Sequence, residues 1–124
     1  MNKRQFNSFC KSLPQTTHVV QWGGADVWKV GGKVFAIGWD IEDEPTFAIT
    51  FKVSEMSFEI LQEKPGLRPA PYLASRGLKW IQHYGEPGLS DAGLKECIRR
   101  SYTMIAEALP KKKKLELGLG SSAL

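Results

Sequence analysis

The sequence is poor in residues that form covalent or metal cross-links. It has two cysteines, Cys10 and Cys97, and two histidines, His18 and His83. Two cysteines give no disulfide framework, and thiols on the apolar side of helix-like segments are usually small buried hydrophobes. Neither histidine lies at metal-ligand spacing from the other or from a cysteine. We therefore expect a reducing compartment and no disulfide, metal site or cofactor.

Long hydrophobic runs are also missing. No stretch approaches the ~18 consecutive apolar residues that a membrane-spanning helix needs. The first residues include Lys3 and Arg4 and lead into an amphipathic segment, whereas a signal peptide has an apolar core. The sequence therefore predicts a cytoplasmic protein that does not enter a membrane.

Complete catalytic motifs are the third absence. Gly32-Lys33 resembles the end of a phosphate-binding P-loop, but Val27 replaces its first glycine and Val34 replaces the Ser or Thr that should follow. Residues 73–77 resemble a nucleophile elbow without its first glycine. The motifs therefore predict no enzyme.

The histidines leave one catalytic alternative open. His18 is expected to order the loop before Trp22 by hydrogen bonding, and a role as ligand or base is the less favoured interpretation. An enzymatic function would require a cleft that brings His18 or His83 beside a carboxylate or thiol.

The positive charge is concentrated at one end of the chain. The net charge is +4, but four of the 17 basic residues are Lys111–Lys114, and the other 13 only balance the 13 acidic residues. Acidic side chains cluster at Asp40, Glu42, Asp43 and Glu44. This spacing lacks the glycine and the terminal glutamate of an EF-hand, so a solvated hairpin tip is favoured over a cation loop. Such a tip would repel DNA and leave the rest of the surface biased towards positive charge.

Apolar periodicity predicts the elements of one domain over residues 1–110. A helical stripe covers 6–13, between the possible cap Asn2 and Pro14. Alternation predicts strands at 25–30 and 33–39 around a Gly31-Gly32 hairpin turn, then at 46–53 and 78–84. Helices are expected after Ser54 and from Ser90 to Pro110. The sequence thus predicts an α+β fold with an antiparallel sheet of four to five strands and about three helices on one face. Residues 111–124 are expected to be a basic, disordered tail.

Alternation around the hairpin predicts the two faces of the sheet. A two-residue turn pairs Trp28 with Phe35 and Val27 with Ala36, and paired residues share a face. The expected core face carries Trp28, Phe35, Ile37, Trp39, Phe47, Ile49, Phe51 and Trp80. The expected open face carries Val27, Lys29, Ala36, Gly38, Ala48, Thr50, Lys52, Lys79 and His83. Trp22 precedes the strand in a glycine-rich loop and falls outside this pattern.

Several segments together resemble the YjbR/MmcQ family of small bacterial proteins. The matching pieces are His18–Gly23 followed by Val27–Ala36, Phe51–Ser54, Pro69–Ala74 followed by Lys79–Ile81, and Ser101–Tyr102. They cover most of residues 1–110 in the order of the family. The resemblance implies an antiparallel sheet with helices on one side, similar to the double-wing DNA-binding domain of the phage transcription factor MotA. It also implies DNA binding and brings no catalytic residues.

The resemblance and the expected open face lead to one favoured function and one alternative. The favoured function is binding of duplex DNA by a monomer, through Lys29, Lys52, Arg68, Arg76 and Lys79. The lysines would contact phosphates, and Arg68 and Arg76 would reach phosphates or guanine edges. The alternative is a protein-interaction or small-ligand module. A continuous apolar pocket around Trp22 and Tyr72, without a positive stripe, would favour this alternative.

Overall fold

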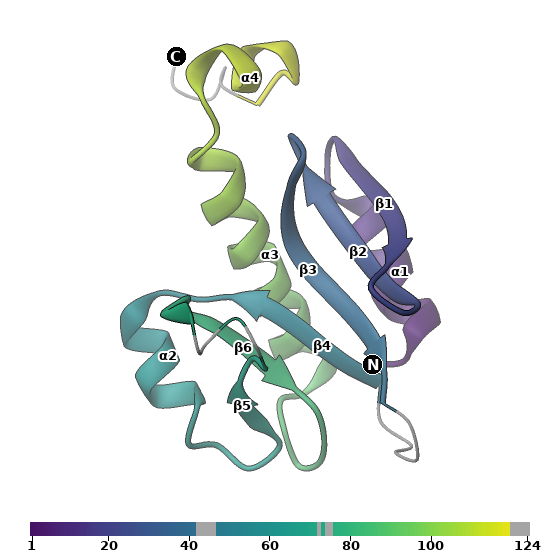
Figure 1. Ribbon diagram of the computed structural model, residues 1–124, viewed down its shortest axis with the longest axis vertical. Helices are drawn as coiled ribbons and strands as arrows, with labels where there is room; N and C mark the ends of the chain where they lie inside the picture. Colours follow the sequence, from purple (N-terminus) through teal and green to yellow (C-terminus); the bar gives the residue numbers. More distant parts are fainter. Residues whose placement is uncertain (42–46, 72, 74–75, 120–124) are drawn as a thin grey trace.

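A computed structural model of the protein describes residues 1–41, 47–71, 73 and 76–119. The chain forms one antiparallel sheet of six strands in the order β1-β2-β3-β4-β6-β5 (Figure 1). The strands are β1 (Thr16–Gln21), β2 (Ala25–Val30), β3 (Lys33–Asp40), β4 (Phe47–Lys52), β5 (Leu67–Pro69) and β6 (Trp80–His83). The helices are α1 (Lys3–Ser12), α2 (Glu55–Leu61), α3 (Asp91–Glu107) and α4 (Lys111–Glu116).

The first three helices begin at the caps that the sequence predicts. Asn2 accepts a hydrogen bond from the backbone N–H of Gln5, whose side chain accepts one from the N–H of Asn2. At the start of α2 the hydroxyl of Ser54 accepts a hydrogen bond from the N–H of Ser57, and at the start of α3 that of Ser90 accepts one from the N–H of Gly93. Each cap satisfies a backbone donor that has no partner within the helix, so these short polar residues fix where the helices start.

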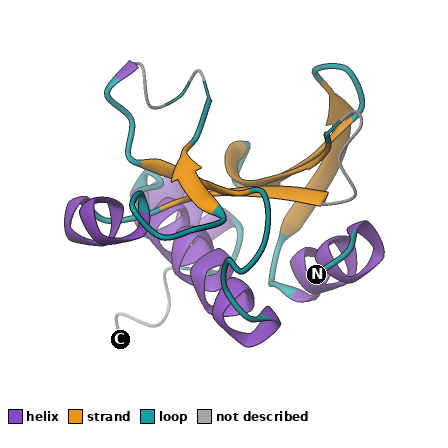
Figure 2. Cartoon of the chain, turned by 90° about the horizontal axis from the view of Figure 1, so that it is seen from below, coloured by secondary structure: helices purple, strands orange, loops and turns teal. Residues whose placement is uncertain are grey.

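The core lies between the sheet and helices α1 and α3. Phe6 and Cys10 from α1, and Leu94 and Ile98 from α3, are fully buried against the strands. Figure 2 shows these helices on one side of the sheet and loops rising on the opposite side. The opposite side is called the helix-free side below.

One irregularity in β3 changes the predicted faces. The observed pairs are Lys29 with Val34 and Trp28 with Ala36, so Phe35 is an extra residue between two regular pairs. Such a β-bulge turns two consecutive residues to the same side. Phe35 and Ala36 are both fully buried in the core cluster with Trp28.

The bulge reverses the alternation for the rest of β3. Ile37 and Trp39 were predicted in the core but lie on the helix-free side. Trp80 was also predicted in the core and also lies on that side, but for a different reason, since it pairs with Lys52 of β4. Conversely, the residues Ala36, Gly38 and His83 were predicted on the open face but lie on the helix side. The prediction for Trp28, Phe47, Ile49 and Phe51 as core residues is confirmed.

The α+β class and the antiparallel sheet are confirmed, whereas the numbers of strands and helices differ from the prediction. Strands β1 and β5 are not among the strands predicted from the sequence. Helix α4 lies in the segment expected to be a disordered tail, and residues 120–124 fall outside the described residues. The predicted acidic tip at Glu42, Asp43 and Glu44 also falls outside them.

Candidate functional site

The helix-free side of the sheet carries a hollow of about 460 Å³, which we call the trough. Its lining is mostly apolar. The lining residues are Trp22, Ile37, Trp39, Ile41, Thr50, Arg68, Ala70, Pro71, Leu73 and Gln82. Its volume is within the range of about 300–1,000 Å³ that is usual for small-molecule pockets.

The floor of the trough follows from strand pairing. Ile37 pairs with Thr50, Thr50 with Gln82 and Gln82 with Arg68, so these four side chains form one row across β3, β4, β6 and β5. Trp39 lies two residues beyond Ile37 on the same face of β3. The bulge at Phe35 is what turns Ile37 and Trp39 to this side, and it therefore adds two apolar side chains to the floor.

Two connections form the walls. Trp22 lies in the turn between β1 and β2, where Trp22, Gly23 and Gly24 have φ angles of 52°, 78° and 101°. A positive φ is uncommon for a residue other than glycine, so the backbone of Trp22 has an unusual conformation. In this turn 54% of the surface of Trp22 is exposed to solvent. The opposite wall is formed by Ala70, Pro71 and Leu73, after β5. Tyr72, which the sequence analysis placed at such a pocket, lies outside the described residues.

Among the described residues that line the trough, Arg68 carries the charge. The Nε–H of Arg68 donates a hydrogen bond to Oε1 of Gln82 over 2.8 Å. The guanidinium carbon lies 4.4 Å from the ring centroid of Tyr84. A hydrogen bond at one edge and a ring beneath the plane restrict the orientation of the guanidinium group.

The other four predicted DNA contacts are spread over different places. Lys29 lies on the helix-free face of β2, and Arg76 is exposed in the loop before β6. Lys79 lies over the ring of Phe58 in α2, 4.8 Å from its centroid. Lys52 lines a separate hollow between α2 and α3. Arg68 is the one member of the predicted set that lines the trough.

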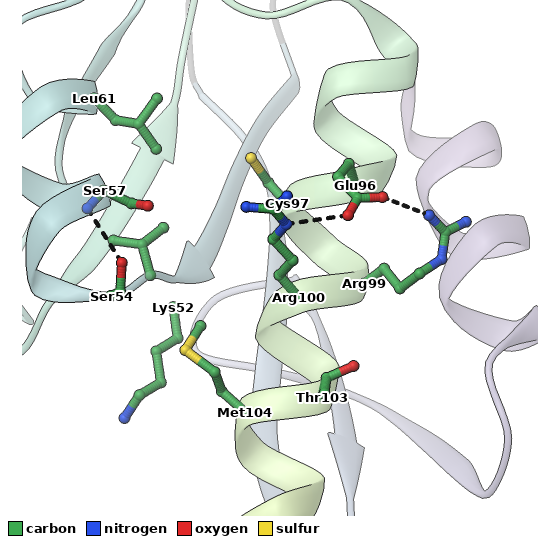
Figure 3. A pocket seen from close by; sticks show the side chains of 11 residues that line it. Lys52, Ser54, Ser57, Leu61, Glu96, Cys97, Arg99, Arg100, Thr103 and Met104 are labelled. Carbon is green, nitrogen blue, oxygen red and sulfur yellow. Dashed lines mark hydrogen bonds and ion pairs between the residues drawn. The ribbon is translucent and has the colours of Figure 1, made fainter.

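The hollow between α2 and α3 measures about 370 Å³ (Figure 3). In Figure 3 the side chain of Cys97 points into it from α3, and Arg100 is held by Glu96. Burial raises the pKa of the Cys97 thiol, so this cysteine is protonated at neutral pH and is a poor nucleophile. Cys97 is therefore not an activated nucleophile in this hollow.

His18 has a carboxylate partner, as an enzymatic interpretation would require. Its Nε2 lies 2.8 Å from Oδ1 of the buried Asp26, and its ring stacks on Trp28 with centroids 4.7 Å apart. The pair supports the predicted ordering role of His18. Within the described ranges, neither histidine lines the trough or the hollow between α2 and α3, and no serine hydroxyl or cysteine thiol is hydrogen-bonded to His18.

The described part of the chain has no group of three or more His, Cys, Asp or Glu side chains with metal-binding geometry. None of its helices is long and apolar enough to cross a membrane.

Sequence reasoning identified part of the trough. It singled out Trp22 as an aromatic residue outside the core pattern and Arg68 as a binding residue. It missed Ile37 and Trp39, because their side of the sheet depends on the bulge. It missed Gln82, because the side of this residue is set by its pairing with Thr50 of β4. The one available signal was the pair of adjacent small and large apolar residues, Phe35-Ala36, which a bulge can bury together.

Comparisons with known proteins identify the fold. The family model described as YjbR matches residues 11–104. Protein DR2400 of Deinococcus radiodurans, a DUF419 domain, superimposes with a TM-score of 0.79 and 23% identity, over 94% of this chain and 87% of that one. A protein from Pseudomonas syringae superimposes with a TM-score of 0.69 and 22% identity, over 85% of this chain and 99% of that one. No curated protein matches the chain.

Proposed function

The chain belongs to the YjbR family, and we propose that it is a monomeric, non-catalytic binding module that takes a small apolar ligand into the trough. The observation that carries this proposal is the exposure of aromatic side chains inside a hollow. Trp22 is 54% exposed and Trp39 is 38% exposed, and both line the trough. Contiguous apolar surface in contact with water is unfavourable, so a ligand that covers it gains free energy from burial.

The lining also supports a non-catalytic role. Its polar members are the Thr50 hydroxyl, the Gln82 amide and the Arg68 guanidinium. An arginine stays protonated and cannot serve as a general base at neutral pH. Among the described lining residues there is no carboxylate, imidazole or thiol. These groups suit orientation and recognition of a ligand, and they offer no general base or activated nucleophile.

Titration with the neutral fluorophore N-phenylnaphthylamine tests the proposal. Its emission rises in apolar surroundings, so saturable enhancement is expected with the wild-type chain. Ile37→Ser and Trp39→Ala should each weaken binding by about fivefold or more, because each removes apolar area from the trough. Analytical ultracentrifugation should give the mass of a monomer both without and with bound fluorophore.

Ile60→Ser is the matched control, since Ile60 is an exposed isoleucine on α2, away from the trough. It should bind the fluorophore as the wild type does. Absence of saturable binding, or equal losses in Ile37→Ser and Ile60→Ser, would contradict the proposal. Circular dichroism of each variant distinguishes loss of binding from loss of the fold.

Duplex DNA is the second candidate ligand, favoured by the placement of Lys29 and Arg68 on the same helix-free face. Phosphate contacts release counterions, so binding through two or three cations should weaken modestly as salt rises. Lys29→Glu should reduce affinity for every duplex sequence alike. Lys52→Glu, which changes a lysine that lines the hollow between α2 and α3, tests whether the region near this hollow also contributes. If neither substitution changes binding of duplex at low salt, or no duplex binds, DNA recognition by this face is wrong.

A further inference from the structure

We propose that the trough is selective for small planar aromatic molecules that carry one carboxylate, with Arg68 as the group that binds the carboxylate. This inference rests on the proposed function, because it names the chemical class of the ligand for the same trough. Three features carry it: the fixed orientation of Arg68, the charge balance of the lining and the arrangement of the aromatic side chains.

The orientation of Arg68 leaves one edge of the guanidinium group available. Its Nε–H is already bonded to Gln82. The Tyr84 ring lies against one face of the group. The two terminal nitrogens, Nη1 and Nη2, form the remaining edge, whose parallel N–H groups match the two oxygens of a carboxylate. A guanidinium group that is already oriented loses little conformational entropy when it binds such a partner.

Gln82 strengthens this arrangement. Its side chain is almost fully buried in the floor of the trough, and its Oε1 accepts the hydrogen bond from Arg68. The amide oxygen is therefore directed at the guanidinium group, so the amide nitrogen points elsewhere. Gln82 is thus a positioning residue for Arg68.

The charge of the lining favours a single negative charge on the ligand. Arg68 is the only charged side chain among the described lining residues. In the described part of the chain, no carboxylate lies within ion-pair distance of Arg68. A lone cation beside apolar surface attracts an anion more strongly than one in bulk water. A carboxylate matches this single charge, whereas a phosphate dianion would leave a negative charge uncompensated.

The body of the ligand follows from the aromatic residues. Trp22 rises from one wall and Trp39 from the floor, with Ile37 and Leu73 completing the apolar lining. Indole rings favour offset or edge-to-face contacts with another ring, in addition to burial of apolar area. A flat aromatic body therefore fits this lining better than a branched aliphatic or strongly polar one.

Three ligands with the same ring test the inference: naphthoate, naphthalenemethanol and naphthyl phosphate. Calorimetric titration of the full chain should give about tenfold tighter binding of naphthoate than of the neutral alcohol. In Arg68→Gln this preference should disappear, while the alcohol binds as it does to the wild type. Arg68→Lys should restore only part of the preference, because an ammonium group lacks the paired N–H edge. Arg76→Gln removes an exposed arginine outside the trough and should keep the full preference.

Each other outcome has a defined meaning. Binding of the alcohol without preference for naphthoate overturns the inference and leaves the proposed function intact. Failure of all three ligands overturns both. Tighter binding of naphthyl phosphate than of naphthoate contradicts the carboxylate assignment. Loss of alcohol binding in Arg68→Gln would mean that Arg68 maintains the shape of the trough, which also overturns the assignment.

Discussion

The hydroxyl group of Ser101 in α3 donates a hydrogen bond to the carbonyl oxygen of Phe35, with the two oxygens 2.7 Å apart. The same hydroxyl accepts a hydrogen bond from the backbone N–H of Lys52 over 2.9 Å. Ser101 is fully buried, so one side chain satisfies two backbone groups that water does not reach. It thereby ties the bulge of β3 and the end of β4 to the long helix.

Ser101→Ala should lower the free energy of unfolding by about 1–3 kcal/mol, because it leaves buried backbone groups without their partner. Urea denaturation of the two chains measures the difference. Ser57→Ala on α2 is the control and should change stability by less than about 0.5 kcal/mol, since no hydrogen bond of the described chain uses the Ser57 hydroxyl. A loss of equal size in both variants would contradict the role given to Ser101.

Gly38→Ala should destabilise the fold through crowding. A Cβ atom at residue 38 would lie 2.5 Å from Cζ of Phe47 and 2.6 Å from Cε2 of Phe6. Rings packed in a core can move little, so a loss of about 1–3 kcal/mol is expected. Thermal unfolding provides the measurement. Gly85→Ala should be tolerated, because a Cβ there meets no heavy atom within 4 Å.

His83 should make stability depend on pH. Burial lowers the pKa of its imidazole from the usual value of 6.5, and the positive charge of the Met1 amino group adds to this effect. The unfolded chain therefore binds a proton more readily than the folded chain. The contribution of neutral His83 to the free energy of unfolding is complete above about pH 6.5. This contribution is lost as the pH falls through the lower pKa that His83 has in the folded state.

Urea denaturation at a series of pH values between about 8 and 5 measures this loss. In His83→Gln the corresponding part of the pH dependence should be absent, whereas the wild type retains it in the same buffers. An identical slope in both chains would show that another group is responsible.

The two partners of Asp26 should differ in their contributions to stability. His18 bonds to this buried carboxylate over 2.8 Å, whereas Lys3 is half-exposed and lies 3.7 Å away. His18→Ala should cost about 1–3 kcal/mol, because it removes a hydrogen bond from a buried charge. Lys3→Ala should cost less than about 1 kcal/mol, as is usual for exposed ion pairs. Chemical denaturation measures the free energy of unfolding of both variants. A larger loss of stability in Lys3→Ala than in His18→Ala would show that Lys3 is the more important partner of Asp26.

Local signals in the sequence predicted most of the helices and the central hairpin. Asn2, Ser54 and Ser90 cap their helices, and the Gly31-Gly32 turn joins β2 and β3. These features depend on residues a few positions apart, so a short stretch of sequence contains all the relevant information.

The trough required information that no short stretch contains. The side of the sheet on which Ile37 and Trp39 lie depends on the extra residue Phe35 in β3. The carbonyl oxygen of Phe35 accepts its hydrogen bond from Ser101, which is 66 positions later in the chain. Simple alternation therefore predicted an open face with small and lysine side chains. The observed face keeps Lys29, Ala48 and Thr50 and adds Ile37 and the indole ring of Trp39. The β1 edge strand was missed because its residues are mostly exposed and show no alternation of burial.

The bulge also separates the surface chemistry of β3 from the length of the strand. Phe35 is the extra residue between the pairs Lys29–Val34 and Trp28–Ala36, so a chain without it would keep both pairs and the later pair Val27–Ile37. Ile37 and Trp39 would stay on the helix-free side, and the loss of one codon at this point would remove a buried ring from the core while the trough keeps its residues.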